Sequence, residues 1–99
     1  MMAPFYEFLN TLSKWLISKG IKKENAQNYI TSLFVALSEN AQKNSGKDLS
    51  TLVKNSQTPG GLNEQGVKLL KKSKFYKSTD KTLNDILKRL KKNWYETNF

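Results

Sequence analysis

Helical periodicity is the feature that most constrains the fold of this chain. Apolar side chains recur at three- and four-residue steps along nearly its whole length, a spacing that places them on one face of an α-helix. The only candidate strand is "KFYK" at residues 74–77, which is too short and isolated to pair. The sequence therefore predicts an all-α fold, and short connections between the helices favour a five-helix bundle over residues 1–99.

Two long amphipathic helices are expected in the N-terminal half. Pro4 suits the first helical position and Gly20 a left-handed C-cap. The second helix is expected over residues 24–44, with Gly46 closing it. Its apolar stripe is broad, so this helix needs neighbours on several sides. The stripe consists of Ala26, Tyr29, Ile30, Leu33, Phe34, Leu37 and Ala41.

Three further helices are expected in the C-terminal half. Asp48 can cap a short helix that ends near Asn55. The next helix begins within residues 55–70, and the last follows Ser78 or Thr79 as its N-cap. The last helix carries an apolar side and a basic outer face. Its apolar side comprises Leu83, Ile86, Leu87, Leu90 and Trp94, and its outer face Lys81, Lys88, Arg89, Lys91 and Lys92.

Composition excludes several classes of chemistry. The chain has no Cys and no His, which rules out disulfides, thiolate metal sites and nucleophilic catalysis built on Ser-His or Cys-His. No apolar run approaches the roughly 20 residues that span a bilayer, and the N-terminus lacks the pattern of a signal peptide. We therefore expect no membrane partner and a cytoplasmic location.

The positive charge is concentrated in the second half of the chain. The net charge is +9, and residues 50–99 hold eleven of the seventeen basic side chains. A small basic helical protein that binds nucleic acid or an acidic partner is one interpretation. The Lys clusters lack helix-turn-helix and RNA-module signatures, so a solvated face is favoured over nucleic-acid binding.

The aromatic side chains also allow two interpretations. They can be platforms for base stacking, or they can pack in a core or a subunit interface. Most of them sit at or beside apolar helical positions, which favours packing. The residues concerned are Tyr6, Trp15, Tyr29, Trp94 and Tyr95.

The stretch "TPGGLN" at residues 58–63 is the strongest candidate for a binding site. Pro59 fixes its own φ, and the glycines permit backbone angles closed to other residues. A helix follows, whose N-terminal N–H groups and dipole favour an anion. Thr58 and Asn63 can add side-chain hydrogen bonds to a carboxylate, and Glu64 lies in the same stretch. The alternative is a simple turn with Asn63 as an N-cap.

The order of these features resembles the C-terminal domain of pyrroline-5-carboxylate reductase. The resemblance covers about Ala3 to Lys92. It is most specific at Thr58-Pro59-Gly60-Gly61, which matches a Ser/Thr-Pro-Gly-Gly loop of that family, and in the aromatic link "KFYKS" that follows. The resemblance implies a dimerisation domain like the C-terminal domain of 6-phosphogluconate dehydrogenase, interleaved with a second copy. A homodimer is therefore the expected assembly.

The resemblance also implies a function in proline biosynthesis or a related imine or keto acid reduction. The intact reductase passes hydride from NAD(P)H to pyrroline-5-carboxylate, and the loop contacts the substrate carboxylate. Carried over by position, Thr58, Gly60 and Gly61 are expected to bind this anion, with Asn63 as an additional donor. In this chain Leu62 and Asn63 stand where the family usually has hydroxyl residues, so the substrate itself can differ.

The cofactor-binding part of that enzyme has no counterpart in this chain. No strand followed by G-x-G-x-x-G occurs in the sequence. The chain therefore looks like a helical domain whose N-terminal Rossmann domain is missing, and we expect no cofactor on it and no reductase activity from it alone.

A dimer is also expected from the size of the chain. A core built from 99 residues is too small to cover so many apolar helical faces. The candidate interface residues are Trp15, Leu33, Phe34 and Leu37.

Overall fold

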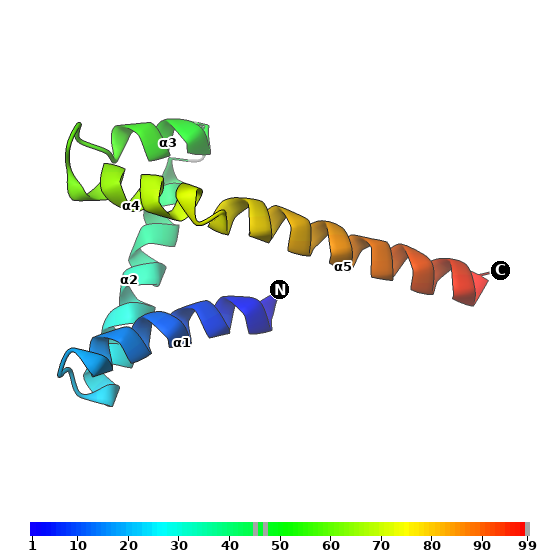
Figure 1. The fold of residues 1–99 in the computed structure, drawn as a ribbon, viewed down its shortest axis with the longest axis horizontal. Helices are drawn as coiled ribbons and strands as arrows, with labels where there is room; N and C mark the ends of the chain where they lie inside the picture. The colour runs from blue at the N-terminus through cyan, green and yellow to red at the C-terminus, as the bar shows by residue number, and fades with distance from the viewer. Residues whose placement is uncertain (45, 47, 99) are drawn as a thin grey trace. The chain divides into compact units, whose positions relative to one another are not determined.

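The computed structural model describes residues 1–44, 46 and 48–98, and these residues form five α-helices and no strand (Figure 1). The all-α prediction is confirmed. The helices are α1 (Met2–Ser18), α2 (Lys23–Lys43), α3 (Leu49–Asn55), α4 (Leu62–Lys72) and α5 (Phe75–Asn98). The chain divides into two compact units, Met1–Leu52 and Val53–Phe99.

In the first unit, α1 and α2 form a helical hairpin. Gly20 has a φ of +97°, the left-handed conformation predicted for it. The N–H of Gly20 donates to the carbonyl of Ile17 at 3.0 Å, and that of Ile21 to the carbonyl of Leu16 at 3.2 Å. This pair of bonds is the Schellman motif, which ends α1 and turns the chain toward α2.

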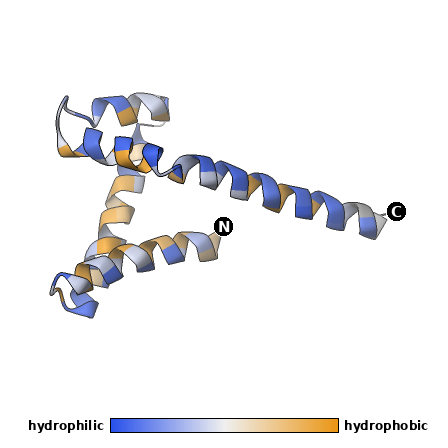
Figure 2. Cartoon of the chain, in the orientation of Figure 1, coloured by the Kyte–Doolittle hydropathy of each residue, from blue (hydrophilic) through white to orange (hydrophobic). Residues whose placement is uncertain are grey.

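The hairpin buries very little side-chain surface. Ala26 is fully buried and Ile30 is 5% exposed. Around them the ring of Phe34 packs edge-on against Phe8, with centroids 5.9 Å apart, and against Phe5 at 6.2 Å. Hydrophobic residues nevertheless recur along α1 and α2 beyond this small core (Figure 2). Large apolar side chains that stay more than a third exposed in this unit include Tyr6, Trp15, Tyr29, Val35 and Leu37.

The α3 cap forms as predicted. Oδ1 of Asp48 accepts hydrogen bonds from the backbone N–H and the hydroxyl of Ser50, both at 2.9 Å. The same two bonds lower the pKa of the Asp48 carboxyl below its usual value.

In the second unit, α4 and α5 are joined by a left-handed residue. Lys74 has a φ of +64°, and its N–H donates to the carbonyl of Lys71 at 3.0 Å. Helix α5 begins directly afterwards, at Phe75.

This start corrects one prediction. Residues 75–77 of "KFYK", the segment that is too short and isolated to pair as a strand, are the first turn of α5. Ser78 and Thr79 lie inside α5 and do not cap it, since the Thr79 hydroxyl donates to the carbonyl of Phe75 at 3.0 Å. A threonine hydroxyl that bonds four residues back is accommodated within a helix, so these residues do not mark its start.

Candidate functional site

The candidate loop is a tight turn in which Gly60 and Gly61 hold the two positions least tolerant of a side chain. The N–H of Gly61 donates to the carbonyl of Thr58 at 2.8 Å. Pro59 occupies the second position of this turn, and Gly60 the third with a φ of +75°, which is the pattern of a type II turn. A Cβ on Gly61 would lie 3.0 Å from the carbonyl oxygen of Thr58. Gly60 is therefore favoured by its φ, and a side chain at Gly61 would require the Thr58 carbonyl to shift by a few tenths of an ångström.

The turn leads directly into the N-terminus of α4. Gly61 is the N-cap, with φ −86° and ψ 174°, and its carbonyl accepts from the N–H of Gln65 at 3.1 Å. The alternative that Asn63 caps the helix is wrong, because Gly61 already holds the extended cap conformation and Asn63 lies within the first turn. The Asn63 side chain instead donates from Nδ2 to the carbonyl of Ser56 at 3.0 Å.

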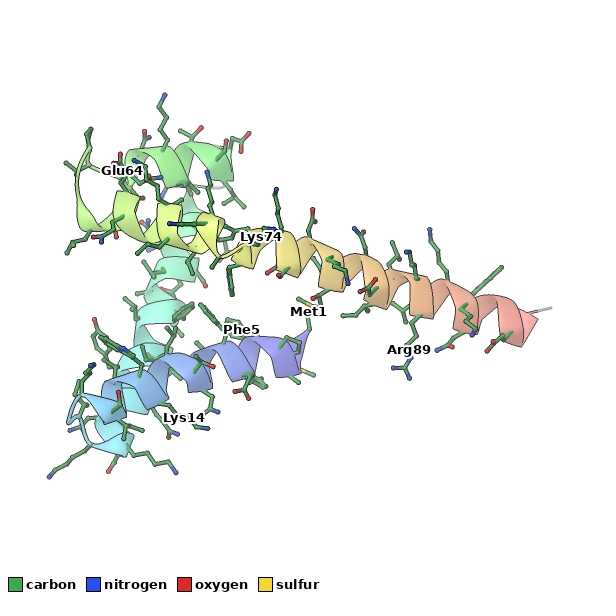
Figure 3. The ribbon with its side chains drawn as sticks, in the orientation of Figure 1. Met1, Phe5, Lys14, Glu64, Lys74 and Arg89 are labelled. Atoms are coloured by element: carbon green, nitrogen blue, oxygen red, sulfur yellow. The ribbon has the colours of Figure 1, made fainter. Side chains whose placement is uncertain are left out.

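A carboxylate of the chain itself lies on the turn. Oε1 of Glu64 accepts from the N–H of Gly60 at 3.2 Å and pairs with Nζ of Lys68 at 3.2 Å; Figure 3 shows Glu64 at the start of α4. The bond from the Gly60 N–H lowers the pKa of the Glu64 carboxyl, and Lys68 lowers it further. The contact shows that this turn accommodates a carboxylate.

The backbone donors of the site can now be assigned. The N–H groups of Gly60 and Gly61 both have acceptors within the chain. The first N–H groups of α4, those of Leu62, Asn63 and Glu64, have no intrahelical acceptor because a helix leaves its first turn unpaired. These three groups carry the positive end of the helix dipole.

A hollow lies beside the turn, along one side of α4. Its volume is about 340 Å³, and it contains two ammonium groups and one carboxylate. It is lined by Gly60, Gly61, Glu64, Gln65, Lys68, Leu69 and Lys72. The turn and the helix start thus combine a small cavity with a local excess of positive charge.

The predicted loop residues lie together within this turn and the first turn of α4. These are Thr58, Gly60, Gly61 and Asn63, and their role in binding a ligand remains a prediction. The contact of Glu64 with Gly60 was not predicted. A Glu three residues after an N-cap is the signal that was available for it, since such a residue commonly reaches back to backbone N–H groups.

The predicted interface residues all lie in the α1–α2 hairpin. Trp15 is 60% and Leu37 55% exposed, whereas Leu33 and Phe34 are half-buried. Nζ of Lys19 lies 5.8 Å from the centroid of the Trp15 ring. Their part in an interface remains a prediction.

The other sequence candidates carry less chemistry. The Lys clusters at 71–77 and 88–92 are exposed, as a solvated face requires. Among the described residues, no group of three or more acidic side chains is arranged to hold a metal ion. No helix in the described part of the chain combines the length and apolarity needed to cross a bilayer.

The described residues are mainly helical, and few of their apolar side chains are buried. A family model described as "Pyrroline-5-carboxylate reductase dimerisation" matches residues 1–93, and the chain belongs to this family. Searches of curated proteins and of solved structures found no match. The family assigns the chain a role in dimerisation, in agreement with the exposure of its apolar side chains.

Proposed function

We propose that this chain forms a homodimer and that its Thr58–Glu64 turn receives the carboxylate of a small substrate. The activity that the chain would serve is that of a pyrroline-5-carboxylate reductase-like NAD(P)H oxidoreductase. Such an enzyme acts in proline biosynthesis or in a related imine or keto acid reduction. The observation that carries the proposal is the geometry of the turn. The turn leads directly into α4, and three unpaired backbone N–H groups lie at the N-terminal end of this helix.

In this proposal the two glycines shape the site, and other groups bind the anion. Their N–H groups are used within the chain, so the substrate carboxylate accepts from the first turn of α4. The Thr58 hydroxyl, which belongs to the turn before α4, and the Lys68 ammonium, which lines the hollow, can add to this binding. The domain thereby contributes positioning and charge complementarity to the reaction.

Leu62 and Asn63 narrow the class of substrate. Leu62 is 85% exposed at the first position of α4, where it offers an apolar surface and no hydroxyl. Asn63 holds its amide against Ser56. A ligand whose carboxylate adjoins an apolar edge would suit Leu62 and Asn63 better than a ligand that needs a hydrogen bond from a second hydroxyl group of the protein.

The described residues do not fit a nicotinamide cofactor. They form helices only, whereas a dinucleotide is held where a strand enters a glycine-rich turn before a helix. No step is therefore assigned to a cofactor on this chain, and the hydride donor is held elsewhere.

An NMR titration tests the binding site. L-proline carries the carboxylate on a five-membered ring, and pyrrolidine is the matched control without it. L-proline is expected to shift the amide resonances of Leu62, Asn63 and Glu64 saturably, and Thr58→Val to weaken binding by about fivefold, the worth of one hydrogen bond. Equal shifts with pyrrolidine, or shifts confined to other residues, would refute the carboxylate role.

Sedimentation tests the assembly separately. The chain is expected to be a dimer at tens of micromolar, since so many apolar side chains are exposed on each copy. A single monomeric species at that concentration would contradict the homodimer.

A further inference from the structure

We propose that the Glu64 side chain competes with the substrate carboxylate for the Thr58–Glu64 turn, and that Glu64 thereby limits how tightly this turn binds an anion. The inference rests on the proposed carboxylate site and adds the residue that regulates it. It is supported by the contacts of Glu64, by a turn whose shape does not depend on them, and by the local balance of charge.

Glu64 already occupies two of the groups that an external carboxylate would use. Its Oε1 atom accepts from the N–H of Gly60 at 3.2 Å and pairs with Nζ of Lys68, also at 3.2 Å. Gly60 is one of the residues expected to contact a substrate anion, and Lys68 lines the hollow beside the turn. A ligand carboxylate that reaches either group must therefore share it with Glu64 or displace Glu64 from it.

The contacts that hold Glu64 are weak enough to exchange. Charge-assisted hydrogen bonds are usually about 2.7–2.9 Å long, whereas both contacts of Glu64 measure 3.2 Å. The Lys68 side chain is 74% exposed, and an ion pair with so exposed a partner contributes little to stability. Rotation about the side-chain bonds of Glu64 is enough to move its carboxylate away from the turn.

The turn does not depend on Glu64 for its shape. The N–H of Gly61 donates to the carbonyl of Thr58 at 2.8 Å, and Nδ2 of Asn63 donates to the carbonyl of Ser56 at 3.0 Å. Neither bond involves the Glu64 side chain. Displacement of the Glu64 carboxylate therefore frees donors for a ligand without opening the loop.

Glu64 is also the local source of negative charge. It is the only acidic residue in the sequence between Asp48 and Asp80, a stretch that holds six lysines. Like charges repel, so the Glu64 carboxylate lowers the affinity of the turn for an anion even where it is not displaced. Removal of this one charge is expected to raise that affinity.

Two substitutions of Glu64 test the competition. The probe is cyclopentanecarboxylate, which carries a carboxylate on a five-membered ring and no ammonium group that Glu64 could attract. An NMR titration is followed at the amides of Leu62, Asn63 and residue 64. Glu64→Gln is expected to lower the dissociation constant at least about threefold, the effect of one unit charge several ångströms away in the dielectric of water. Glu64→Ala is expected to lower it further, because the Gly60 N–H then loses its acceptor. Far-UV circular dichroism checks that both variants remain helical.

Asp85→Asn is the matched control. Asp85 pairs with Lys81 at 3.3 Å, with the same four-residue spacing as Glu64 and Lys68, and the substitution raises the net charge by the same single unit. Asp85 and Lys81 lie on α5 and do not line the hollow, so the dissociation constant is expected to change less than twofold. Cyclopentanecarboxamide is the matched ligand without a charge, and its binding should not respond to Glu64→Gln.

The possible results separate the two proposals. Failure of either Glu64 variant to bind cyclopentanecarboxylate more tightly than the wild type would overturn the competition and leave the carboxylate site intact. An equal gain with Asp85→Asn, or an equal gain for the carboxamide, would overturn it as well, because the effect would then not be a local one on the anion. If the amides of Leu62, Asn63 and residue 64 respond in neither the wild type nor Glu64→Gln, the carboxylate site itself is refuted.

Discussion

Replacing Gly60 by alanine isolates the energetic cost of one backbone angle. Gly60 has a φ of +75°, and a Cβ built on it meets no described heavy atom within 4 Å, its chain neighbours aside. The substitution therefore adds no steric clash, and only the left-handed conformation opposes it. That conformation costs an L-residue about 1–2 kcal/mol.

An opposing term reduces this cost. Alanine restricts the unfolded chain more than glycine does and so favours folding by about 0.4–1 kcal/mol. Gly60→Ala is therefore expected to lower the free energy of unfolding by about 1 kcal/mol, or Tm by about 4–8 °C for a chain of this size. Gly60→Asn is expected to lose less, because asparagine tolerates this conformation better than alanine.

Thermal unfolding followed by circular dichroism measures both variants. Protein concentration must be held constant, because association shifts Tm. An alanine variant as stable as the wild type, or an asparagine variant less stable than the alanine one, would show that the backbone angle does not determine the requirement for glycine.

Two further predictions concern Lys74 and Glu64. Lys74→Gly is expected to raise Tm, because Lys74 holds a φ of +64° and glycine adopts that angle without steric cost; an unchanged or lowered Tm would contradict this. The pKa of Glu64 is lowered in the folded chain, so its contribution to stability is present above its unfolded pKa of about 4.3 and is lost as the pH falls through the lower folded value. Glu64→Gln keeps an acceptor oxygen for Gly60, so the difference in Tm between the wild type and this variant should shrink from pH 6 to pH 3, and a constant difference would argue against the ionised contact.

Local signals in the sequence were sufficient to predict most of the fold. Periodicity located all five helices, Gly20 was correctly expected in the left-handed region, and Asp48 was correctly expected to cap α3. In each of these cases the residue type has one strong local preference. The neighbours in the chain then determine the conformation without help from distant contacts.

The wrong predictions concern helix starts, where two nearby residues could each mark the beginning of the helix. Ser78 and Thr79 are good caps, but Lys74 takes a left-handed angle that is uncommon for lysine, so α5 starts earlier. Asn63 is a good cap as well, but Gly61 holds that position. The bond between Glu64 and Gly60 depends on the path of the turn, which residue preferences alone do not specify.

The bond from the Asn63 side chain to the Ser56 carbonyl has a consequence for the kinetics of binding. It joins the two ends of the loop between α3 and α4 at 3.0 Å, and the turn at Thr58–Gly61 holds the middle. A loop fixed at both places has little conformational freedom left to lose, so a ligand would meet a preorganised surface and pay little ordering entropy. Association at this turn should then be limited by diffusion and orientation and not by rearrangement of the loop.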